Sequence, residues 1–334
     1  MYYSVVIPAR NAGKTIGECV LAALSQSAPK EVYEIVVVDD GSVDGTGAIA
    51  RSHGVRVIPQ PPLGMAAARN TGARAARGEI VVFLDADSVP ALDWLAQMVA
   101  PFDDPSIVGV KGAFQSHETD LLSRLIQAEH DDRYRRLEPG AAVDFIDGYP
   151  AAYRRAAFLA VGGFDPSLAA AEDVELSYRL AKSGKRFTFA PKAKVHHDHG
   201  MTFQRYAARK LRYGLWRSLV YARHPGAARS DRSTPAELRT QIPLAGLTVA
   251  SVVLSSRWQR MLPLAGVFLA AFTSTTMPFA WKARKAGTDA AIASPVLLFV
   301  RALALGTGLA IGGTSLAGQN LLQRVSALRG TFRR

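Results

Sequence analysis

Three long stretches with hardly any charge lie in the last third of the chain, and they constrain its fold more than any other feature. The stretches from Ile242 to Ser256 and from Met261 to Trp281 contain no charged residue, and the stretch from Ala290 to Gly318 contains only Arg301. A run of about 20 apolar residues is long enough to cross a bilayer. We therefore predict two to four transmembrane helices over residues 240–318. The alternative is a soluble domain of buried helices.

Charges near these stretches bear on orientation in the membrane. Basic residues cluster at 282–285, which marks that loop as cytoplasmic, but two arginines at 257–260 compete with it. The chain runs from Met1 into its first apolar strand with no basic, apolar leader. We expect a multi-pass protein of the cell inner membrane or plasma membrane, with its N-terminal domain facing the cytoplasm.

The first two hundred residues have the pattern of a soluble α/β domain. Continuous apolar runs at Val5–Ile7, Ile35–Val38 and Ile80–Leu84 are typical of strands buried on both faces of a mostly parallel sheet. Helical patterns follow at Lys14–Ser25 and Gly45–His53. This alternation of strand and helix predicts a doubly wound sheet.

Composition limits the chemistry further. The single cysteine, Cys19, excludes an intrachain disulfide and a cysteine-based zinc cluster. The net charge of +12 favours an anionic partner, which could be nucleic acid, acidic lipid or a phosphorylated substrate. Because an apolar anchor follows and no nucleic-acid-binding motif is present, we expect no nucleic-acid partner.

Acidic residues follow two of the predicted strands. Asp39 and Asp40 come after the second strand, and Asp85 and Asp87 come after the third. Ligands of open α/β sheets bind at the carboxyl ends of the strands, and a few carboxylates together with substrate phosphates are the usual ligands of Mg²⁺ or Mn²⁺. The alternative is that these acids form turns or cap the next helix.

A third acidic pair, Glu172 and Asp173, stands where a later helix would begin. Acidic residues commonly complement the positive end of a helix, which is the structural interpretation. The functional interpretation is a general base that removes the proton of an acceptor hydroxyl. Arg69, upstream of the third strand, could bind a diphosphate or order the acids.

In combination these motifs resemble family 2 glycosyltransferases, in order and in approximate spacing over residues 1–215. The resemblance rests on six segments, namely Val5–Asn11, Val36–Thr46, Ala68–Gly72, Phe83–Asp87, Gly162–Asp165 and Glu172–Asp173. It implies an α/β GT-A fold with a Rossmann-like mixed sheet, a nucleotide-diphospho-sugar donor, a divalent metal (Mg²⁺ or Mn²⁺) and inversion at the anomeric carbon.

The resemblance also assigns the nucleotide-binding residues. Pro8, Ala9 and Arg10 match the first loop that contacts the nucleotide. Asp40 matches the acid that contacts the base, with Asp39 beside it. UDP is the commonest nucleotide of the family, so a UDP-linked sugar is the expected donor.

The remaining matches concern the diphosphate and the reaction. Arg69 matches an arginine near the diphosphate, Asp85 lies at the position near the ribose, and Asp87 matches the metal ligand of the DXD motif. Asp173 matches the catalytic base, with Glu172 as its neighbour.

A histidine after the base motif sometimes completes the metal site in GT-A enzymes. Three candidates stand close together here, His196, His197 and His199, of which we favour His197. The alternative is a polar loop with solvated imidazoles.

Two further segments complete the expected organisation. Residues 202–239 are basic with apolar positions at helical spacing, which is typical of a helix at a membrane surface that approaches a lipid-linked acceptor. A helix packed on the catalytic domain is the alternative. Residues 319–334 form a basic tail, and Ser116–Leu137 is expected to form another helix.

The predicted function is transfer of a single sugar to a hydroxyl of a lipid-linked or glycan acceptor in envelope or polysaccharide biosynthesis. Processive members of the family carry a Gln-x-x-Arg-Trp motif after the base, and this chain has none. Two alternatives stay open, a nucleotidyltransferase on a related sheet and a catalytically inactive membrane scaffold.

Overall fold

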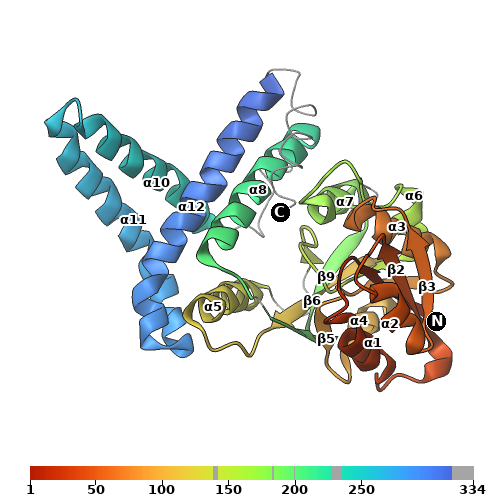
Figure 1. Cartoon of the computed structure of the whole chain (residues 1–334). Helices are drawn as coiled ribbons and strands as arrows, with labels where there is room; N and C mark the ends of the chain where they lie inside the picture. Colours follow the sequence, from red (N-terminus) through yellow and green to blue (C-terminus); the bar gives the residue numbers. More distant parts are fainter. Residues whose placement is uncertain (138–141, 183, 199, 227–234, 318–334) are drawn as a thin grey trace. The chain divides into compact units, whose positions relative to one another are not determined.

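The structure is a computed structural model that describes residues 1–137, 142–182, 184–198, 200–226 and 235–317 (Figure 1). The predicted tail over 319–334 lies outside these residues. The chain divides into two compact units, Met1–Gly200 and Met201–Arg334.

The first unit is built on one mixed β-sheet, which has nine strands in its described part. The strands are β1 (Tyr3–Ala9), β2 (Tyr33–Asp40), β3 (Arg56–Gln60), β4 (Ile80–Phe83), β5 (Ser88–Pro90), β6 (Ile107–Gln115), β7 (Ala142–Val143), β8 (Ala151–Arg154) and β9 (Arg186–His197). Their order is β3-β2-β1-β4-β8-β6-β9-β5, with β7 beside β9. Strands β1 to β4 pair in parallel, whereas β8 is antiparallel to both of its neighbours. The predicted α/β fold with a mixed sheet is therefore confirmed.

Helices cover both faces of this sheet in Figure 1. The helices of the first unit are α1 (Ile16–Leu24), α2 (Thr46–Ser52), α3 (Met65–Ala75), α4 (Trp94–Val99), α5 (Leu121–Arg136), α6 (Arg155–Ala160) and α7 (Glu172–Ala181), with 3₁₀ turns at Lys30–Val32 and Ala100–Asp103. The predicted strands and the first two predicted helices agree with the observed elements to within a few residues. The helix expected at Ser116–Leu137 begins at Leu121, after the capping residue Asp120, whose carboxylate accepts from Ser123 N at 3.0 Å.

Two apolar cores form because successive residues of a strand point to opposite faces. Val5 and Ile7 of β1 join a cluster with α1, α2 and α4, whereas Val6 joins the cluster with α3, α6 and α7. The uninterrupted apolar runs of β1, β2 and β4 thus supply both cores, as expected for strands covered on both sides.

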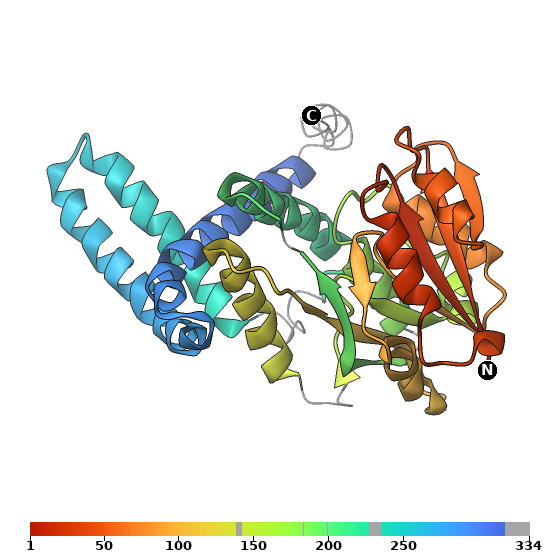
Figure 2. The same cartoon turned by 60° about the horizontal axis from the view of Figure 1, so that its bottom comes forward.

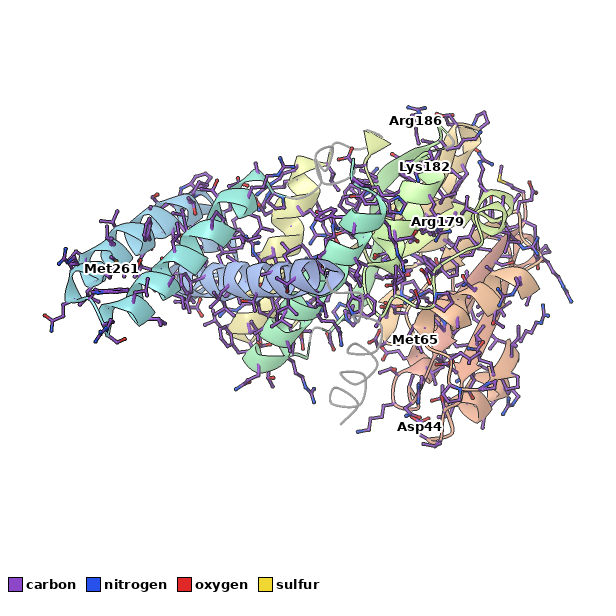
Figure 3. All side chains as sticks on the ribbon, turned by 90° about the horizontal axis from the view of Figure 1, so that it is seen from above. Asp44, Met65, Arg179, Lys182, Arg186 and Met261 are labelled. Carbon is purple, nitrogen blue, oxygen red and sulfur yellow. The ribbon has the colours of Figure 1, made fainter. Side chains whose placement is uncertain are left out.

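The second unit consists of long helices, namely α8 (Phe203–Arg223), α10 (Ala236–Ser255), α11 (Leu262–Ala283) and α12 (Thr288–Ala317), with 3₁₀ turns at Gln259–Met261 and Arg284–Ala286. Helices α10 and α11 lie side by side in both views, and Met261 lies at the turn between them (Figures 2 and 3). Within the described residues, three segments are long and apolar enough to cross a membrane: Ala236–Ser255, Gln259–Ala286 and Thr288–Thr314. The prediction of C-terminal transmembrane helices is confirmed to that extent.

Small residues bring α8 and α12 into close contact. A Cβ atom added to Gly214 of α8 would lie 2.4 Å from the carbonyl oxygen of Leu305, and one added to Gly308 of α12 would lie 2.1 Å from that of Leu211. Both distances are far below van der Waals contact, so the backbones meet where side chains are absent. Close approach of this kind is typical of helices that pack in membranes.

The charged residue in the last apolar stretch has a partner in the second unit. Helix α12 continues through Arg301, whose Nη2 donates to Oε1 of Gln241 on α10 at 2.9 Å. The stretch is therefore not broken into two helices at this point. Arg301 instead points toward another helix of the unit, as intramembrane charges usually do.

Candidate active site

The loops after β1 and β2 lie side by side because these strands pair in parallel, with Ala9 opposite Asp39. Asn11 N donates to Ser42 Oγ at 3.0 Å, and Val43 N donates to the Asn11 side chain at 3.0 Å. These bonds join the two segments in which sequence analysis placed the nucleotide contacts. Pro8 and Ala9 are buried at the end of β1, whereas Arg10 is exposed beyond it.

Asp40 has a structural role in the loop before α3. Its carboxylate is fully buried and accepts from Gln60 Nε2 at 2.7 Å, Leu63 N at 2.8 Å and Gly64 N at 2.9 Å, while Arg10 Nη1 lies 3.9 Å away. It therefore orders the segment before α3. Asp39 accepts from Ser42 N at 3.0 Å and shapes the turn after β2. Contact of either acid with a nucleotide base stays a prediction.

Arg69 joins the two acidic motifs. It is buried on α3, and its guanidinium donates to Asp85 Oδ1 at 2.8 Å and to Glu172 Oε1 at 3.3 Å. The guanidinium also lies 3.6 Å from the centroid of the Tyr149 ring, and the Tyr149 hydroxyl donates to Glu172 at 3.3 Å. One arginine thus connects the segment after β4 with the start of α7, although these are far apart in the sequence.

The second acid of the DXD motif lies beside a histidine. Strand β5 pairs antiparallel with β9, with Ser88 opposite His197, and this pairing brings His197 Nδ1 to 3.6 Å from Asp87 Oδ1. Packing around Asp87 raises the pKa of its carboxyl, His197 lowers that pKa and Asp85 raises it. A bound cation would reverse this effect by favouring the ionised carboxylate.

An oxygen and a nitrogen ligand at this separation fit a divalent cation that also binds substrate phosphates and water. Asp87 is about half exposed, so it is open to such a ligand. Within the described ranges, no cluster of three or more His, Cys, Asp or Glu side chains could hold a metal by itself. The residues present fit a sparse metal site of two protein ligands.

The two histidines next to His197 in the predicted cluster are His196 and His199. His196 Nε2 lies 3.1 Å from Asp198 Oδ1, and its ring contacts that of His117 in a tilted arrangement with the centroids 4.5 Å apart. His199 lies outside the described residues. The structure therefore brings together Asp87 and the favoured histidine, His197, whose role as a metal ligand stays a prediction.

Asp173 is a buried carboxylate in the first turn of α7. Its Oδ1 accepts from Val174 N at 2.7 Å and its Oδ2 accepts from Gly148 N. Burial raises the pKa of Asp173 to about 7, and the nearby carboxylates of Glu172 and Asp147 contribute to the rise. A carboxyl with this pKa exchanges its proton near neutral pH, which suits a general base.

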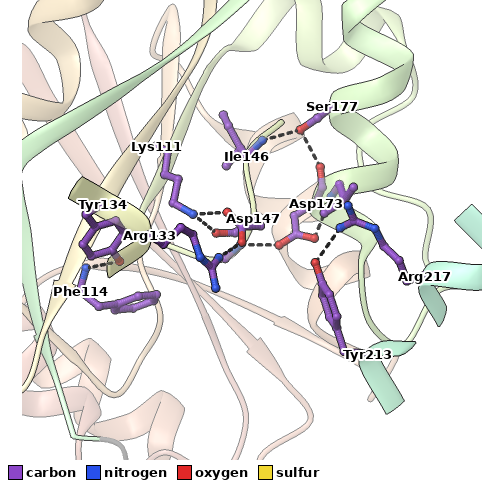
Figure 4. A network of polar contacts seen from close by, with 12 residues as sticks. Lys111, Phe114, Arg133, Tyr134, Ile146, Asp147, Asp173, Ser177, Tyr213 and Arg217 are labelled. Carbon is purple, nitrogen blue, oxygen red and sulfur yellow. Dashed lines mark hydrogen bonds and ion pairs between the residues drawn. The ribbon is translucent and has the colours of Figure 1, made fainter. Parts of the chain in front are cut away.

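Sequence reasoning missed the residues that surround this base. Tyr149 stacks on Arg69. Lys111 and Arg133 both form ion pairs with Asp147, as Figure 4 shows. The only local signal was the pair Asp147-Gly148, which indicates a turn. Nothing in the sequence pattern connected that turn with Asp173.

The fold and this arrangement define a class of protein, the GT-A glycosyltransferase fold. A mannosyltransferase from Pyrobaculum calidifontis, solved in complex with GDP-Man and Mn²⁺, superposes with a TM-score of 0.62. It is 25% identical, and the match covers 93% of this chain and 86% of that one.

The family follows from sequence comparison. The family model described as glycosyl transferase family 2 matches residues 4–162. Residues 4–162 therefore carry a family 2 glycosyltransferase domain, as the motifs predicted.

Curated relatives extend the similarity beyond the domain. A pre-mycofactocin glycosyltransferase of Mycobacterium tuberculosis is 30% identical over 250 residues, which is 70% of this chain and 49% of the relative. A succinoglycan biosynthesis protein of Rhizobium meliloti is 28% identical over 287 residues, with 80% of this chain and 82% of the relative covered. The chain thus spans about half the length of the mycobacterial relative.

Proposed function

We propose that this chain is an inverting glycosyltransferase, anchored in the membrane, that transfers one sugar from a nucleotide-diphospho-sugar to an acceptor hydroxyl. The observation that carries the proposal is the bridge made by Arg69 between Asp85 and Glu172. This bridge ties the segment that bears Asp87, the candidate metal ligand, to the turn of α7 that bears Asp173, the candidate base.

The bond changes assign roles to these residues. The acceptor oxygen forms a bond to the anomeric carbon on the face opposite the donor diphosphate, and the bond from that carbon to the phosphate oxygen breaks. The hydroxyl proton passes to a carboxylate oxygen of Asp173. The nucleoside diphosphate departs with the electron pair of the broken bond, and the anomeric configuration is inverted.

Asp87 and His197 would hold a divalent cation, Mg²⁺ or Mn²⁺, which supplies stabilisation of the negative charge on the departing diphosphate. The solved mannosyltransferase carries Mn²⁺ together with its donor, which supports this assignment. Arg69 keeps Asp85 and Glu172 in place and neutralises part of their charge. Asp39, Asp40 and the segment Pro8–Arg10 are proposed to bind the nucleotide.

The proposed acceptor is a lipid-linked sugar or a glycan, reached at the cytoplasmic face of the membrane. Three candidate spans and a basic helix, α8, support a membrane location. The similarity to a succinoglycan biosynthesis protein supports a place in envelope or polysaccharide synthesis. A UDP-linked donor is the expectation from the family, while the solved mannosyltransferase binds GDP-Man.

The test uses the full chain in detergent or lipid vesicles. UDP- and GDP-linked sugars are screened by thermal shift with Mn²⁺ or Mg²⁺, because a true donor stabilises the folded state by mass action. The stabilising donor is then incubated with polyprenyl phosphate acceptors or soluble glycans, and nucleoside diphosphate release is measured. Asp93→Asn, an exposed aspartate outside the site, is the matched control for Asp173→Asn.

Acceptor-dependent release of nucleoside diphosphate by the wild type and by Asp93→Asn, but not by Asp173→Asn, supports the proposal. Release of pyrophosphate would instead identify a nucleotidyltransferase. If no nucleotide sugar stabilises the chain or is consumed, the protein is a scaffold and the proposal is wrong.

A further inference from the structure

A buried group of charges, Lys111, Arg133 and Asp147, lies next to the candidate base and belongs to none of the family motifs (Figure 4). Lys111 comes from the middle of β6, Arg133 from α5, and Asp147 from the segment between β7 and β8. The Lys111 side chain is 5% exposed and Asp147 is 16% exposed. Charges with so little contact with water are costly unless they are paired, and here Lys111 and Arg133 both pair with Asp147.

The residues next to Asp147 form hydrogen bonds with α7, the helix that carries the candidate base Asp173. Ile146 N donates to Ser177 Oγ at 3.0 Å, and Ser177 Oγ donates to the carbonyl oxygen of Asp173 at 2.8 Å. Gly148 N donates to the Asp173 carboxylate itself. The residues on either side of Asp147 are thus both bonded to α7, one of them directly to the base.

Asp147 itself connects this segment to Lys111 on β6 and Arg133 on α5. Lys111 Nζ donates to the backbone carbonyl of Asp147 at 2.8 Å and also to its carboxylate, whose other oxygen is paired with Arg133. Gly148 adopts a φ of +76°, a left-handed conformation that glycine tolerates without strain. A rigid anchor at Asp147 therefore determines where the Gly148 N–H points.

We propose that Lys111, Asp147 and Arg133 form a positioning triad that holds the Gly148 N–H on Asp173 and adjusts the basicity of that carboxylate. The inference rests on the proposed function, since it concerns the base of that reaction. It assigns a role to three residues that lie outside the motifs of the nucleotide and metal sites.

The balance of charge in the triad makes the inference testable. Asp147 raises the pKa of Asp173, whereas Lys111 and Asp173 attract each other electrostatically. Removing the negative charge of Asp147 leaves two cations near the base, so its pKa falls. Removing the positive charge of Lys111 leaves Asp147 less neutralised, so the pKa rises. Asp173 also interacts with Glu172 on α7 and with the hydroxyls of Tyr149 and Tyr153, and the N–H groups of Gly148 and Val174 lower its pKa.

The experiment compares Asp147→Asn, Lys111→Met and Arg133→Gln in the full chain. The pH dependence of kcat/KM is measured with the donor and acceptor that the wild type uses. We expect the acidic limb to move about one unit to lower pH in Asp147→Asn and about one unit to higher pH in Lys111→Met. Arg133→Gln is expected to move it in the same direction as Lys111→Met but less, because Arg133 is 28% exposed.

Two further variants separate this role from a merely structural one. The double variant Lys111→Met/Asp147→Asn removes both charges of the buried pair, so its limb is expected to return toward the wild-type position. Arg186→Gln, in an exposed ion pair with Asp104, is the matched control for loss of a cation and is expected to leave the limb in place.

The outcomes distinguish this inference from the proposed function. Shifts of opposite sign in Asp147→Asn and Lys111→Met support the triad, whereas lowered rates with an unmoved limb, or a change confined to the KM of the acceptor, overturn it. If Asp147→Asn does not fold, Lys111→Met and Arg133→Gln decide the question, because both are expected to move the limb to higher pH and an unmoved limb in both overturns the triad. If the wild type transfers no sugar, the proposed function is wrong, and a ¹³C carboxyl titration of Asp173 in the same variants still tests the triad.

Discussion

The two units of this protein differ in where they place apolar and charged side chains. In the first unit, the large apolar side chains fill two cores, and buried charges such as Arg69 and Asp173 gather near the ends of strands and the start of α7. In the second unit, large apolar side chains point outward, with Ile292 75% exposed and Val296 63% exposed. The first pattern is typical of a domain in water and the second of helices in lipid.

Buried polar groups differ between the units as well. In the second unit they are mostly hydroxyls that bond to their own helix, such as Thr248 Oγ1 to the Leu244 carbonyl at 2.8 Å and Thr276 Oγ1 to the Thr273 carbonyl at 2.7 Å. In the first unit they include ions with partners from distant segments, such as Arg69 with Asp85 and Lys111 with Asp147. The ion pairs of Arg69 and Lys111 thus join distant segments of the first unit, whereas these hydroxyls of the second unit bond within a single helix.

The largest expected effect is at the candidate base. Asp173→Asn removes the proton acceptor, so we expect transfer to fall about 100- to 10,000-fold. Because the pKa of Asp173 is about 7, wild-type transfer is expected to fall about tenfold per pH unit well below pH 7, where the carboxyl is protonated. Steady-state rates from pH 5 to 9 test both statements. A fully active Asp173→Asn variant would place the base elsewhere.

The next largest effect concerns the stability that the first unit gains from its buried ion pairs. Arg69→Met leaves Asp85 and Glu172 without their shared cation, and removing one partner of a buried pair costs about 3–5 kcal/mol. Denaturant unfolding of the full chain in detergent measures this cost. Arg186→Met is the control, since its partner Asp104 is exposed, and equal losses in both variants would contradict the comparison.

A smaller effect is expected at the exposed apolar face of the second unit, where a charge should disfavour insertion into a membrane. Val296→Arg is expected to disfavour membrane insertion of α12 by about 2.5–3.5 kcal/mol, because a charge near the centre of a bilayer is costly. The control is Val43→Arg, at an apolar residue of the first unit that is 91% exposed and should tolerate charge. Membrane fractionation and a glycosylation-site insertion assay measure the result. Normal insertion of Val296→Arg would contradict the assignment of α12 as a membrane-spanning helix.

The smallest effect concerns helix capping in the two units. Asp120 accepts from Ser123 N at the start of α5, and Thr202 accepts from Arg205 N at 3.3 Å at the start of α8. Replacing either residue by alanine is expected to cost about 1 kcal/mol of stability. The Asp120 cap lowers the pKa of that carboxyl, so its contribution is present above the ordinary pKa of 3.8 and is lost as the pH falls through the lowered value. Unfolding at pH 7 and pH 3 measures both, and an Asp120→Ala cost that did not diminish at pH 3 would contradict this account.

The local structure and the division of the chain can be predicted from the amino-acid sequence. The apolar runs of β1, β2 and β4, the helices between them and the long apolar helices after Arg239 follow from periodicity and composition, which depend on neighbours in the chain. The positions of Asp39, Asp85 and Asp173 at element ends follow from the same local patterns. The family resemblance added the roles that these positions take.

Which of these residues come into contact depends on the tertiary fold. His197 reaches Asp87 only because β5 pairs antiparallel with β9, and the two residues are 110 positions apart. Arg69 joins Asp85 to Glu172, and Lys111, Arg133 and Asp147 converge beside Asp173 from a strand, a helix and a connecting segment. Local periodicity carries no information on strand order or on long-range ion pairs, because these depend on how the whole sheet and its two cores pack.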